Sequence, residues 1–543
     1  MEPHHSQVKV SDILIDENSK VHVRFAFDAL GGGKGSFEIP RGQTTDLRKV
    51  CSNLLDAGAN LPRETAIDSI KHAIDTAPTA PTGRIVSTHG WSNDIYVSHN
   101  SVHGRRTLPV SYRPRVDVDA AFKVSAGTVA GWREGLRGPI AESSYLTFAA
   151  CLPFGAPLLK RLGIEGCVMN TVGETTTGKT TLARVGQSAS GRADANDLAT
   201  LDLTKRGGEE LCQNHCDSLV VLDETARLDK NFSRQDLEDF IYAIAGGRGR
   251  TRSAVVARNG LRNASWRVFA LLTSEVSLDP KRLKGGAALR YAEIPVPPAR
   301  AGGIFDKTGL KGSKRRAKAM AHAEQVNQTI GANYGVAFPA FMEKVMTDLP
   351  RAIAFADERA KLFLQKLGVE DNAQEKRLAS KFAVVYAGGA IAARLGILPC
   401  DENHVFEAVR RVYLRSRKAV CTVEEQSPRV LNKLVEAGRR HKFPLLCKGE
   451  ELPSAKDAVW GIRREIDGER VLVFPLSLLR RLGGSQLAAF DLLGYWSKRG
   501  YLVMSRDGKR TRQVLVNGWS DKRQRYVCLK LSALPSTERS STR

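Results

Sequence analysis

The chain has 543 residues, 42% of them hydrophobic and 26% charged, which is typical of a folded protein of about two to four domains and excludes a disordered one. Its 82 Lys and Arg outnumber its 58 Asp and Glu, which gives a formal net charge of +24 and a pI of about 9.8. This excess indicates a polyanionic partner such as nucleic acid; a merely soluble basic protein is the alternative.

Neither the first residues nor the cysteines indicate secretion. Residues 1–5 are polar, which predicts no secretory signal, and no run approaches the roughly 20 apolar residues of a membrane helix. The nine cysteines show no regular spacing, and the one close set, Cys212, His215 and Cys216, lacks the second ligand pair of a zinc motif. We therefore expect a cytoplasmic protein with reduced, structural thiols and no membrane contact.

Residues 1–125 are predicted to form an N-terminal α+β accessory domain. Residues 21–27 alternate as a strand does, and residues 31–35 supply a glycine-rich turn. Amphipathic patterns predict helices over 47–57 and 66–74, and short strands over 84–86 and 94–97 follow. Nothing in this part of the sequence indicates catalytic chemistry.

The pattern changes at residue 126, where a parallel α/β core is predicted to begin and to extend to residue 312. Thr128 opens a helix over 129–136, and residues 143–162 form a long apolar helical stretch. A strand over 166–170, a glycine loop and a helix over 179–188 then start a βαβ arrangement.

The loop between that strand and that helix fits the pattern G-x-x-x-x-G-K-[ST] at every position. Its glycines allow a tight turn in which backbone N–H groups point at phosphates, and the positive end of the helix dipole faces the same anion. We expect Lys179 to reach the β- and γ-phosphates of ATP and the Thr180 hydroxyl to bind Mg²⁺. The expected nucleotide-binding residues are Gly173, Glu174, Thr175, Thr176, Thr177, Gly178, Lys179, Thr180 and Thr181.

Residues 218–224 form an apolar run that ends in Asp223 and Glu224, as a strand buried on both faces would. Asp223 would hold the magnesium through water, and Glu224 would orient or deprotonate the attacking water. An acid pair that only ends a strand is the alternative. The spacing after the glycine loop makes this pair a Walker B motif, and its adjacent acids favour hydrolysis over binding alone.

Residues 266–275 are predicted to form another buried strand ending in polar side chains. In an ATPase of this build the end of this strand lies between the two acid-bearing loops, so we expect Thr273 to sense the γ-phosphate or the lytic water. Arg290 follows and is expected to stabilise transition-state charge, in its own or a neighbouring subunit; a surface salt bridge is the alternative. The predicted catalytic residues are Lys179, Asp223, Glu224, Thr273 and Arg290.

These elements, in this order, resemble the domain-of-unknown-function 927 family of bacterial mobile-element and phage ATPases over residues 10–305. The sequence departs from the family's usual pattern in two places: it has Glu174-Thr175-Thr176 for Asp-Ser-Ser, and Leu272-Thr273-Ser274 for Ser-Thr-Gly. The motifs that carry the resemblance are Gly90-Trp91, Trp132-Arg133, the loop from Gly173 to Thr181, Leu222-Asp223-Glu224, Trp266-Arg267 and Leu289-Arg290.

The resemblance implies an AAA+ helicase of the minichromosome-maintenance type, a homo-hexamer or other ring that unwinds DNA for replication of a mobile element. Between the acidic and sensor strands, Asn259-Gly260 separates two short extended runs, a strong signal for a hairpin. Such a hairpin would project into the central channel of the ring, where Arg258 and Arg262 would grip the DNA backbone. A surface hairpin that makes subunit contacts is the alternative.

The rest of the chain is predicted to add a helical part and a small basic domain. A basic run over 311–318 reads as a solvated loop or helix start, residues 313–425 as a helical lid or linker, and residues 536–543 as a disordered tail. Residues 426–535 suggest a winged-helix-like domain.

Within that basic domain we expect a helix over 488–499, then a hairpin formed by strands 501–505 and 511–516 around a basic turn. A protein-interaction module is the alternative to a DNA-binding one. The residues expected to contact DNA phosphates are Lys498, Arg499, Lys509, Arg510 and Arg512.

We therefore expect an α/β fold: an AAA+ type P-loop NTPase core with an N-terminal α+β accessory domain, a helical lid and a C-terminal winged-helix-like domain. ATP and Mg²⁺ are the expected cofactors, and DNA, single-stranded in a central channel, is the expected partner. The expected function is that of an ATP-dependent DNA helicase or translocase of a mobile genetic element or phage. The alternatives are an ATP-hydrolysing switch, such as a defence sensor or DNA-loading factor, and a DNA-binding regulator with a degenerate site. The intact Lys179, Thr180, Asp223 and Glu224 argue against the regulator.

Overall fold

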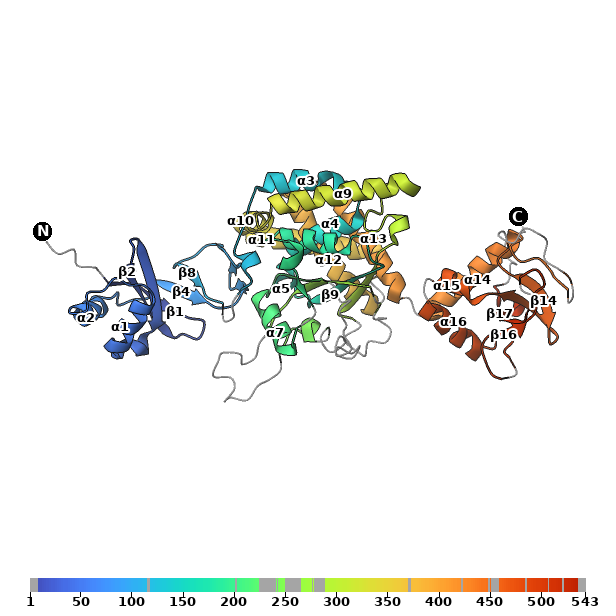
Figure 1. Ribbon diagram of the computed structural model, residues 1–543, viewed down its shortest axis with the longest axis horizontal. Helices are drawn as coiled ribbons and strands as arrows, with labels where there is room; N and C mark the ends of the chain where they lie inside the picture. Colours follow the sequence, from blue (N-terminus) through green and yellow to red (C-terminus); the bar gives the residue numbers. More distant parts are fainter. Residues whose placement is uncertain are drawn as a thin grey trace. The chain divides into compact units, whose positions relative to one another are not determined.

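The computed structural model divides into two units, Met1–Ala419 and Val420–Arg543 (Figure 1). The finer boundaries predicted at residues 125, 312 and 425 stay predictions. Within the described residues, no helix has both the length and the apolar character needed to cross a membrane. The structure describes residues 8–114, 118–200, 203–223, 241, 243–249, 265–275, 277, 289–369, 373–420, 423–447, 450, 459–483, 486–505, 507–519 and 522–535.

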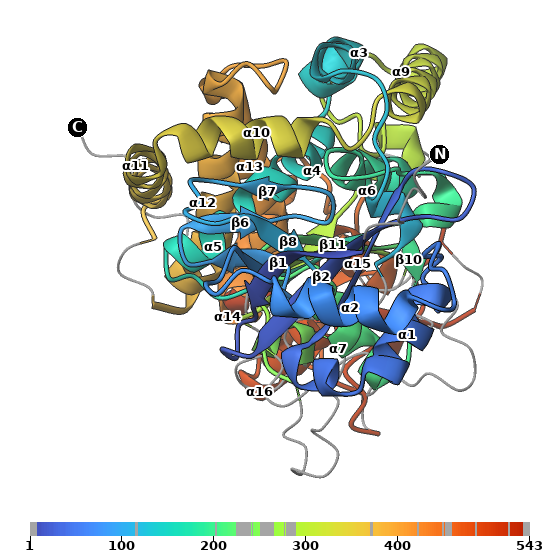
Figure 2. The ribbon, with the colours of Figure 1, turned by 90° about the vertical axis from the view of Figure 1, so that its left-hand side faces the viewer.

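The first sheet is built on the strand and helices predicted near the N-terminus. Alternate residues Val23, Phe25 and Phe27 point into its core, as the period of two in the sequence predicts. Two helices, α1 (Leu47–Asp56) and α2 (Ala66–Asp75), lie together on one face of the sheet (Figure 2). The strands, in the order β3-β2-β1-β4-β8, are β1 (Lys9–Ile15), β2 (Val21–Asp28), β3 (Lys34–Pro40), β4 (Gly83–Val86) and β8 (Val110–Tyr112).

A small antiparallel sheet follows, with β5 (Gly90–Ser92), β6 (Ile95–Val97) and β7 (Val102–His103) in sequence order. Only the middle strand was predicted, within 94–97. Its Tyr96 is fully buried against Trp91, with ring centroids 5.2 Å apart. This sheet packs on the core described next.

The central sheet is parallel throughout, in the order β10-β11-β12-β9-β13. Its inner strands are buried on both faces, which is why their sequences are nearly unbroken apolar runs. Because all strands point the same way, their carboxyl ends meet at one edge, and β12 lies between β9 and β11. The strands are β9 (Cys167–Val172), β10 (Ala199–Thr200), β11 (Leu219–Asp223), β12 (Phe269–Ser274) and β13 (Tyr291–Pro295).

Two helices of the core begin at hydroxyl caps, and the cap Thr128 was predicted to open its helix. The Thr128 and Ser143 hydroxyls accept the N–H groups of Gly131 and Leu146 at the first turns of α3 and α4. The long helix predicted over 143–162 is two helices, broken at Pro157, whose nitrogen has no hydrogen to donate. These helices are α3 (Val129–Ala141), α4 (Ser144–Gly155), α5 (Leu158–Arg161), α6 (Lys179–Ser188) and α7 (Lys205–Asn214).

The predicted helix-rich segment packs directly on this core. Helix α9 lies beside α3, and α12 lies against α4 (Figure 1). Gly388 makes the second contact possible, because a Cβ there would lie 2.4 Å from the Gly155 nitrogen. These helices are α9 (Gly312–Ala332), α10 (Ala337–Thr347), α11 (Leu349–Leu367), α12 (Ala373–Arg394) and α13 (Glu402–Val420).

The second unit is an α+β fold with an antiparallel sheet in the order β14-β15-β17-β16. Trp496 is fully buried at its centre and donates its indole N–H to the Ser427 hydroxyl at 2.7 Å. The elements are α14 (Val423–Arg439), β14 (Ile462–Ile466), β15 (Glu469–Phe474), α15 (Leu476–Gly483), α16 (Gln486–Lys498), β16 (Arg512–Val514) and β17 (Gln524–Lys530).

The hairpin predicted between residues 501–505 and 511–516 is wrong. The tight turn is present, since the Gly508 N–H donates to the Ser505 carbonyl at 2.9 Å. However, β16 pairs with β17, and residues 501–505 contribute only a single bridge from Leu502 to the same strand. The apolar strand β17 accepts a partner on each side, and this tertiary pairing overrides the local hairpin signal.

Candidate active site

The predicted phosphate loop joins the end of β9 to the start of α6 at the carboxyl edge of the central sheet. Thr176 and Gly178 have positive φ angles of 60° and 92°, so the chain reverses sharply before the helix begins. Gly178 is the N-cap and offers no capping side chain, which leaves the first N–H groups of α6 directed at the loop. This arrangement suits an anion.

Lys179 lies folded over this loop and is only 9% exposed. Its ammonium group donates to the Gly173 and Glu174 carbonyls, each at 2.8 Å. The Thr177 hydroxyl closes the same turn by donating to the Glu174 carbonyl at 2.9 Å. Of the remaining predicted contacts, Glu174, Thr175, Thr176 and Thr180 are exposed, and Thr181 is half-buried.

Asp223 and Thr273 meet at the same edge, at the ends of the neighbouring strands β11 and β12. The Thr273 hydroxyl donates to Asp223 Oδ1 at 2.5 Å, and Thr273 is only 2% exposed. The structure thus brings together the acid and the sensor that the sequence predicts 50 residues apart. Glu224 lies outside the described residues.

The side chains at this edge fit a magnesium ion. A threonine hydroxyl, on Thr180, and a carboxylate, on Asp223, are oxygen donors of the kind that Mg²⁺ prefers. In the part of the chain that the structure describes, no group of three or more His, Cys, Asp or Glu forms a metal centre. A site with few protein oxygens is compatible with Mg²⁺, because this ion usually keeps several waters and binds substrate phosphates.

Arg290 is not part of this site within one chain. The Val168 N–H donates to its carbonyl at 2.9 Å, which places Arg290 beside the start of β9, whereas the phosphate loop follows its end. Its guanidinium donates to both Glu165 carboxylate oxygens at 3.1 and 3.2 Å. The expectation of a role in its own chain is therefore corrected, and the salt bridge is what the structure contains. A role toward a neighbouring subunit stays a prediction.

The Gly90-Trp91 motif lies, like Arg290, at the amino edge of the central sheet, where its strands begin. There it joins the small antiparallel sheet to the core. The Trp91 N–H donates to Asp217 at 3.0 Å, and the Trp91 indole donates to the Pro157 carbonyl at 2.7 Å. Gly90 has a φ of 94°, and a Cβ there would lie 2.6 Å from the Cys216 carbonyl. Asp217 lies two residues before β11, so this contact holds the amino end of the strand that carries Asp223.

Two further tryptophans of the motifs act in the same way. The Trp132 indole donates to the Ser188 hydroxyl at 2.9 Å, which joins α3 to the end of α6. The Trp266 indole donates to the Ile244 carbonyl at 2.8 Å, just before β12. The indole groups of these motifs therefore anchor the sheet and its helices rather than take part in chemistry.

Three histidine rings meet next to the Gly-Trp contact, a cluster that sequence reasoning missed. The His99 ring lies 4.3 Å from His89 and 4.8 Å from His215, and Phe122 packs on the group. Burial lowers the pKa of His89 to about 4 and that of His215 to about 3. His215 thus belongs to a neutral aromatic cluster, while its predicted neighbour Cys212 is buried in the core of the sheet. His89 lies just before β5 and His99 two residues after β6, and no motif in the sequence links them to His215.

The predicted pore residues Arg258 and Arg262 lie outside the described residues. On either side of their segment, Arg248 and Ser265 form an antiparallel bridge. The Trp266 N–H also donates to the Gly247 carbonyl at 3.0 Å. The predicted hairpin and its DNA contacts therefore stay predictions.

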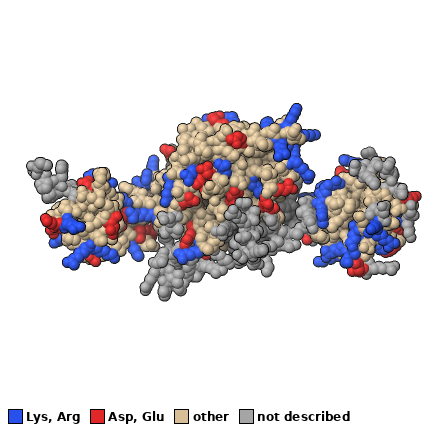
Figure 3. Space-filling model, viewed as in Figure 1, with Lys and Arg blue, Asp and Glu red and all other residues tan. Residues whose placement is uncertain are grey.

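Of the predicted DNA contacts in the second unit, four are exposed: Lys498, Arg499, Lys509 and Arg510. Arg512 is different, because its guanidinium forms a bidentate pair with Asp467 and its side chain is only 20% exposed. On the face drawn in Figure 3, basic side chains predominate over acidic ones on this unit. Its surface thus offers cations, although Arg512 is paired with Asp467 and Lys509 lies 3.0 Å from the Asp507 carboxylate.

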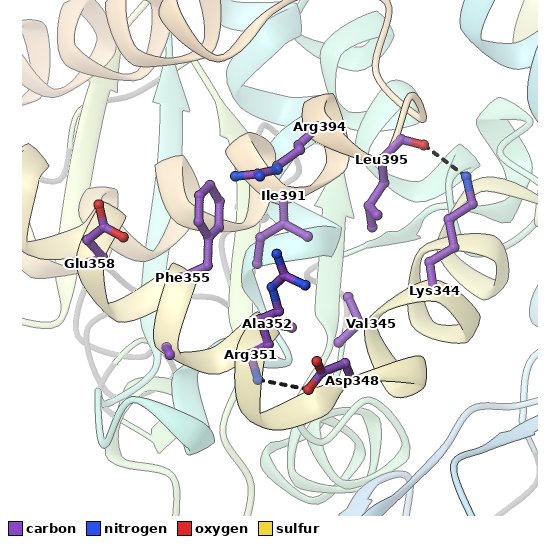
Figure 4. A pocket seen from close by; sticks show the side chains of 11 residues that line it. Lys344, Val345, Asp348, Arg351, Ala352, Phe355, Glu358, Ile391, Arg394 and Leu395 are labelled. Atoms are coloured by element: carbon purple, nitrogen blue, oxygen red, sulfur yellow. Dashed lines mark hydrogen bonds between the residues drawn. The ribbon is translucent and has the colours of Figure 1, made fainter.

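A cavity of about 460 Å³ lies elsewhere, among α10, α11 and α12 (Figure 4). Phe355 and Ile391 form part of its wall, and the Lys344 ammonium on its rim donates to the Leu395 carbonyl at 2.9 Å. None of the predicted site residues lines it.

The sequence was compared with models of protein families and with curated proteins. Residues 5–266 match the family described as "Domain of unknown function (DUF927)", which confirms the resemblance predicted from the motifs. Leu289-Arg290 lies beyond the matched residues. No curated protein matches the chain.

Two solved structures are similar to this chain to very different degrees. One, described as "SCCmec type IV Cch - active helicase", has a TM-score of 0.58 at 15% identity over 97% of this chain and 93% of that one. The other, described as "The A form apo structure of NrS-1 C terminal region-CTR", has a TM-score of 0.23 at 10% identity over 74% and 91%, too low to carry an argument. The first likeness establishes a shared α/β fold with a parallel sheet.

Proposed function

We propose, on the premise that this chain carries a DUF927 domain over residues 5–266, that it is an AAA+ type ATPase that unwinds or translocates DNA for a mobile genetic element or phage. The observation that carries the proposal is the hydrogen bond from Thr273 to Asp223 beside the phosphate loop. It requires β12 to lie between the loop-bearing strand β9 and the acid-bearing strand β11, which is the order seen. In the proposed mechanism of ATP hydrolysis, the acid Asp223 and the sensor Thr273 both have to lie beside the phosphate loop.

Each residue of the edge then has a definite role. The loop N–H groups and Lys179 bind the β- and γ-phosphates, for which Lys179 exchanges its present carbonyl partners. Bound Mg²⁺ would neutralise phosphate charge. Asp223 and Thr180 would hold the ion, Thr273 fixes the Asp223 carboxylate, and Glu224 would orient the attacking water.

Three observations support DNA as the partner. The net charge of +24 favours a polyanion. The fold is similar over nearly the whole chain to a structure described as an active helicase. In the second unit, three of the four strands of the sheet lie in the order β15-β17-β16, and α15 and α16 come between β15 and β16 in the chain, which is the connectivity of a winged helix. With β16 paired to β17, the wing is the loop that joins these two strands, not the turn around Gly508.

A ring in which the Asn259-Gly260 hairpin lines the channel is the assembly we propose, following the family resemblance. The test is strand displacement from a forked duplex, with ATPase activity measured with and without single-stranded DNA. We expect DNA to stimulate hydrolysis and the wild type to displace the strand, while Lys179→Ala does neither. Hydrolysis that DNA does not stimulate, without displacement, would instead support an ATP-driven switch.

A further inference from the structure

The segment that follows β13, residues 296–306, runs along the phosphate loop and is here named the strap. It touches the loop first at its start. The Val296 N–H donates to the Val172 carbonyl at 2.7 Å, and a Cβ on Gly173 would lie 3.1 Å from the Val296 side chain. The strap thus closes one side of the turn that leaves β9.

The strap meets the loop again just before α6. The Ile304 N–H donates to the Thr177 carbonyl at 3.0 Å, and a Cβ on Gly178 would lie 2.8 Å from the Ile304 side chain. Gly303 has a φ of 57°, and a Cβ there would lie 2.4 Å from the Thr177 carbonyl, so only glycine fits. Both ends of the loop are therefore held by one continuous segment.

The far end of the strap is fixed by a buried carboxylate. The Asp306 side chain is 2% exposed and accepts the Ser144 N–H at 2.8 Å at the start of α4. Its other oxygen lies 3.2 Å from Arg415 and 4.0 Å from Arg411, both on α13. The Ser143 hydroxyl adds a bond of 2.6 Å to the Ile304 carbonyl. A buried charge held by two arginines resists displacement, so the strap is tied to α13.

We propose that Asp306 is a positioning residue for the phosphate loop, and that Arg415 sets its position from α13. The carboxylate holds Ile304 in register with Thr177, so the loop N–H groups are aligned before a nucleotide arrives. This inference rests on the proposed nucleotide site. Nucleotide affinity would then depend on Asp306, which touches no phosphate. It would also depend on α13, a helix outside the sheet, because Arg415 of that helix holds Asp306 in place.

The test measures binding of Mg·ADP and of a Mg-bound non-hydrolysable ATP analogue to Asp306→Asn and Arg415→Met by calorimetry, at a temperature where circular dichroism shows each variant folded. Asp306→Asn keeps the shape and the Ser144 contact but removes the charge that Arg415 meets. We expect each variant to weaken both nucleotides about tenfold, and the double variant to be no weaker than either single one, because the two substitutions remove one interaction.

The matched control is Arg410→Met, because Arg410 is also on α13 but pairs with Glu407 at 3.2 Å, whereas Asp306 pairs with Arg411 and Arg415. It should bind as the wild type does. A merely structural role would lower the melting temperature of Asp306→Asn and Arg415→Met while leaving the affinity of folded protein unchanged, and that result overturns the inference. If Asp306→Asn does not fold, Arg415→Met decides alone. A wild type that binds no nucleotide would instead refute the proposed function.

Discussion

The two edges of the central sheet are built from different kinds of residue. At the carboxyl edge, a loop of glycines and threonines with one folded lysine faces a carboxylate and a hydroxyl. At the amino edge, the turn before β11 is covered by Trp91, Tyr96 and His89, and its Asp217 is buried. Both edges contain motifs of the same family resemblance. The comparison shows a division of roles. The motifs at the carboxyl edge supply the groups proposed to react, and those at the amino edge hold the strands in place.

Removal of Lys179 should have the largest effect on activity. Lys179→Ala takes away the cation that neutralises transferred charge, so the rate of ATP hydrolysis should fall by at least about a hundredfold. Phosphate release measured at saturating ATP checks this, and an unchanged melting temperature shows that the sheet is intact. Substantial hydrolysis by this variant would contradict the proposal that ATP is hydrolysed at the carboxyl edge.

Removal of Trp91 should instead have the largest effect on stability. Trp91→Ala deletes a buried ring and its indole hydrogen bond to the Pro157 carbonyl, so the free energy of unfolding should fall by about 3 kcal/mol or more. Trp91→Phe, which keeps most of the ring and loses the bond to the Pro157 carbonyl, should cost about 1 kcal/mol. Denaturant titration measures both. If folded Trp91→Ala lost hydrolysis as Lys179→Ala does, the division between edges would fail.

Loss of the Thr273 hydroxyl should slow chemistry without loosening the nucleotide. Thr273→Val leaves Asp223 without its donor, and the turnover number should fall about tenfold while nucleotide affinity changes little. Thr171→Val is the matched control, since Thr171 lies opposite Thr273 on β9 and donates only to the Leu272 carbonyl. Equal effects of the two substitutions would argue against a specific role for Thr273.

The histidine cluster predicts a pH dependence that belongs to the amino edge. Burial lowers the folded-state pKa of His89 to about 4, below the value of about 6.5 in the unfolded chain, so the unfolded state takes up the proton first. The free energy of unfolding should therefore fall as pH drops from about 6.5 toward 4, by about 1.4 kcal/mol per pH unit for this group. His89→Gln should remove that part of the slope, whereas His72→Gln, at an exposed position, should not. Denaturant titrations at several pH values within this window test it.

Arg290→Gln should have the smallest effect. Its pair with Glu165 is partly exposed, so stability should change by less than about 1 kcal/mol and hydrolysis should stay within about twofold. A large loss of turnover in the assembled protein, with normal nucleotide binding, would show that Arg290 acts on a neighbouring subunit.

Local pattern predicted the phosphate loop, the buried strands and the helix over 179–188, because turn chemistry and apolar runs are properties of the nearby sequence. The pairing of β16 with β17 was not predictable in this way, since a strand's best partner depends on distant residues. The same holds for Arg290. Arg290 could lie beside a γ-phosphate or at the amino edge, depending on where β13 begins relative to β9. The spacing of residues along the sequence does not reveal that register.

The strap and the histidine cluster were missed for a related reason. Gly302-Gly303 and Asp306 belong to no recognisable sequence motif. Their role is visible only in the folded chain, where the strap contacts both Thr177 and Arg415. His215 is more than a hundred residues from His89 and His99 in the chain, and only the fold brings the three rings together.

Calorimetric titration of Mg·ATP analogue into the full chain, beside Lys179→Ala, tests the central claim most directly. The account predicts saturable binding to the wild type that depends on Mg²⁺ and is lost in the folded variant. Equal uptake of heat by both proteins, or none by folded wild type, would contradict it.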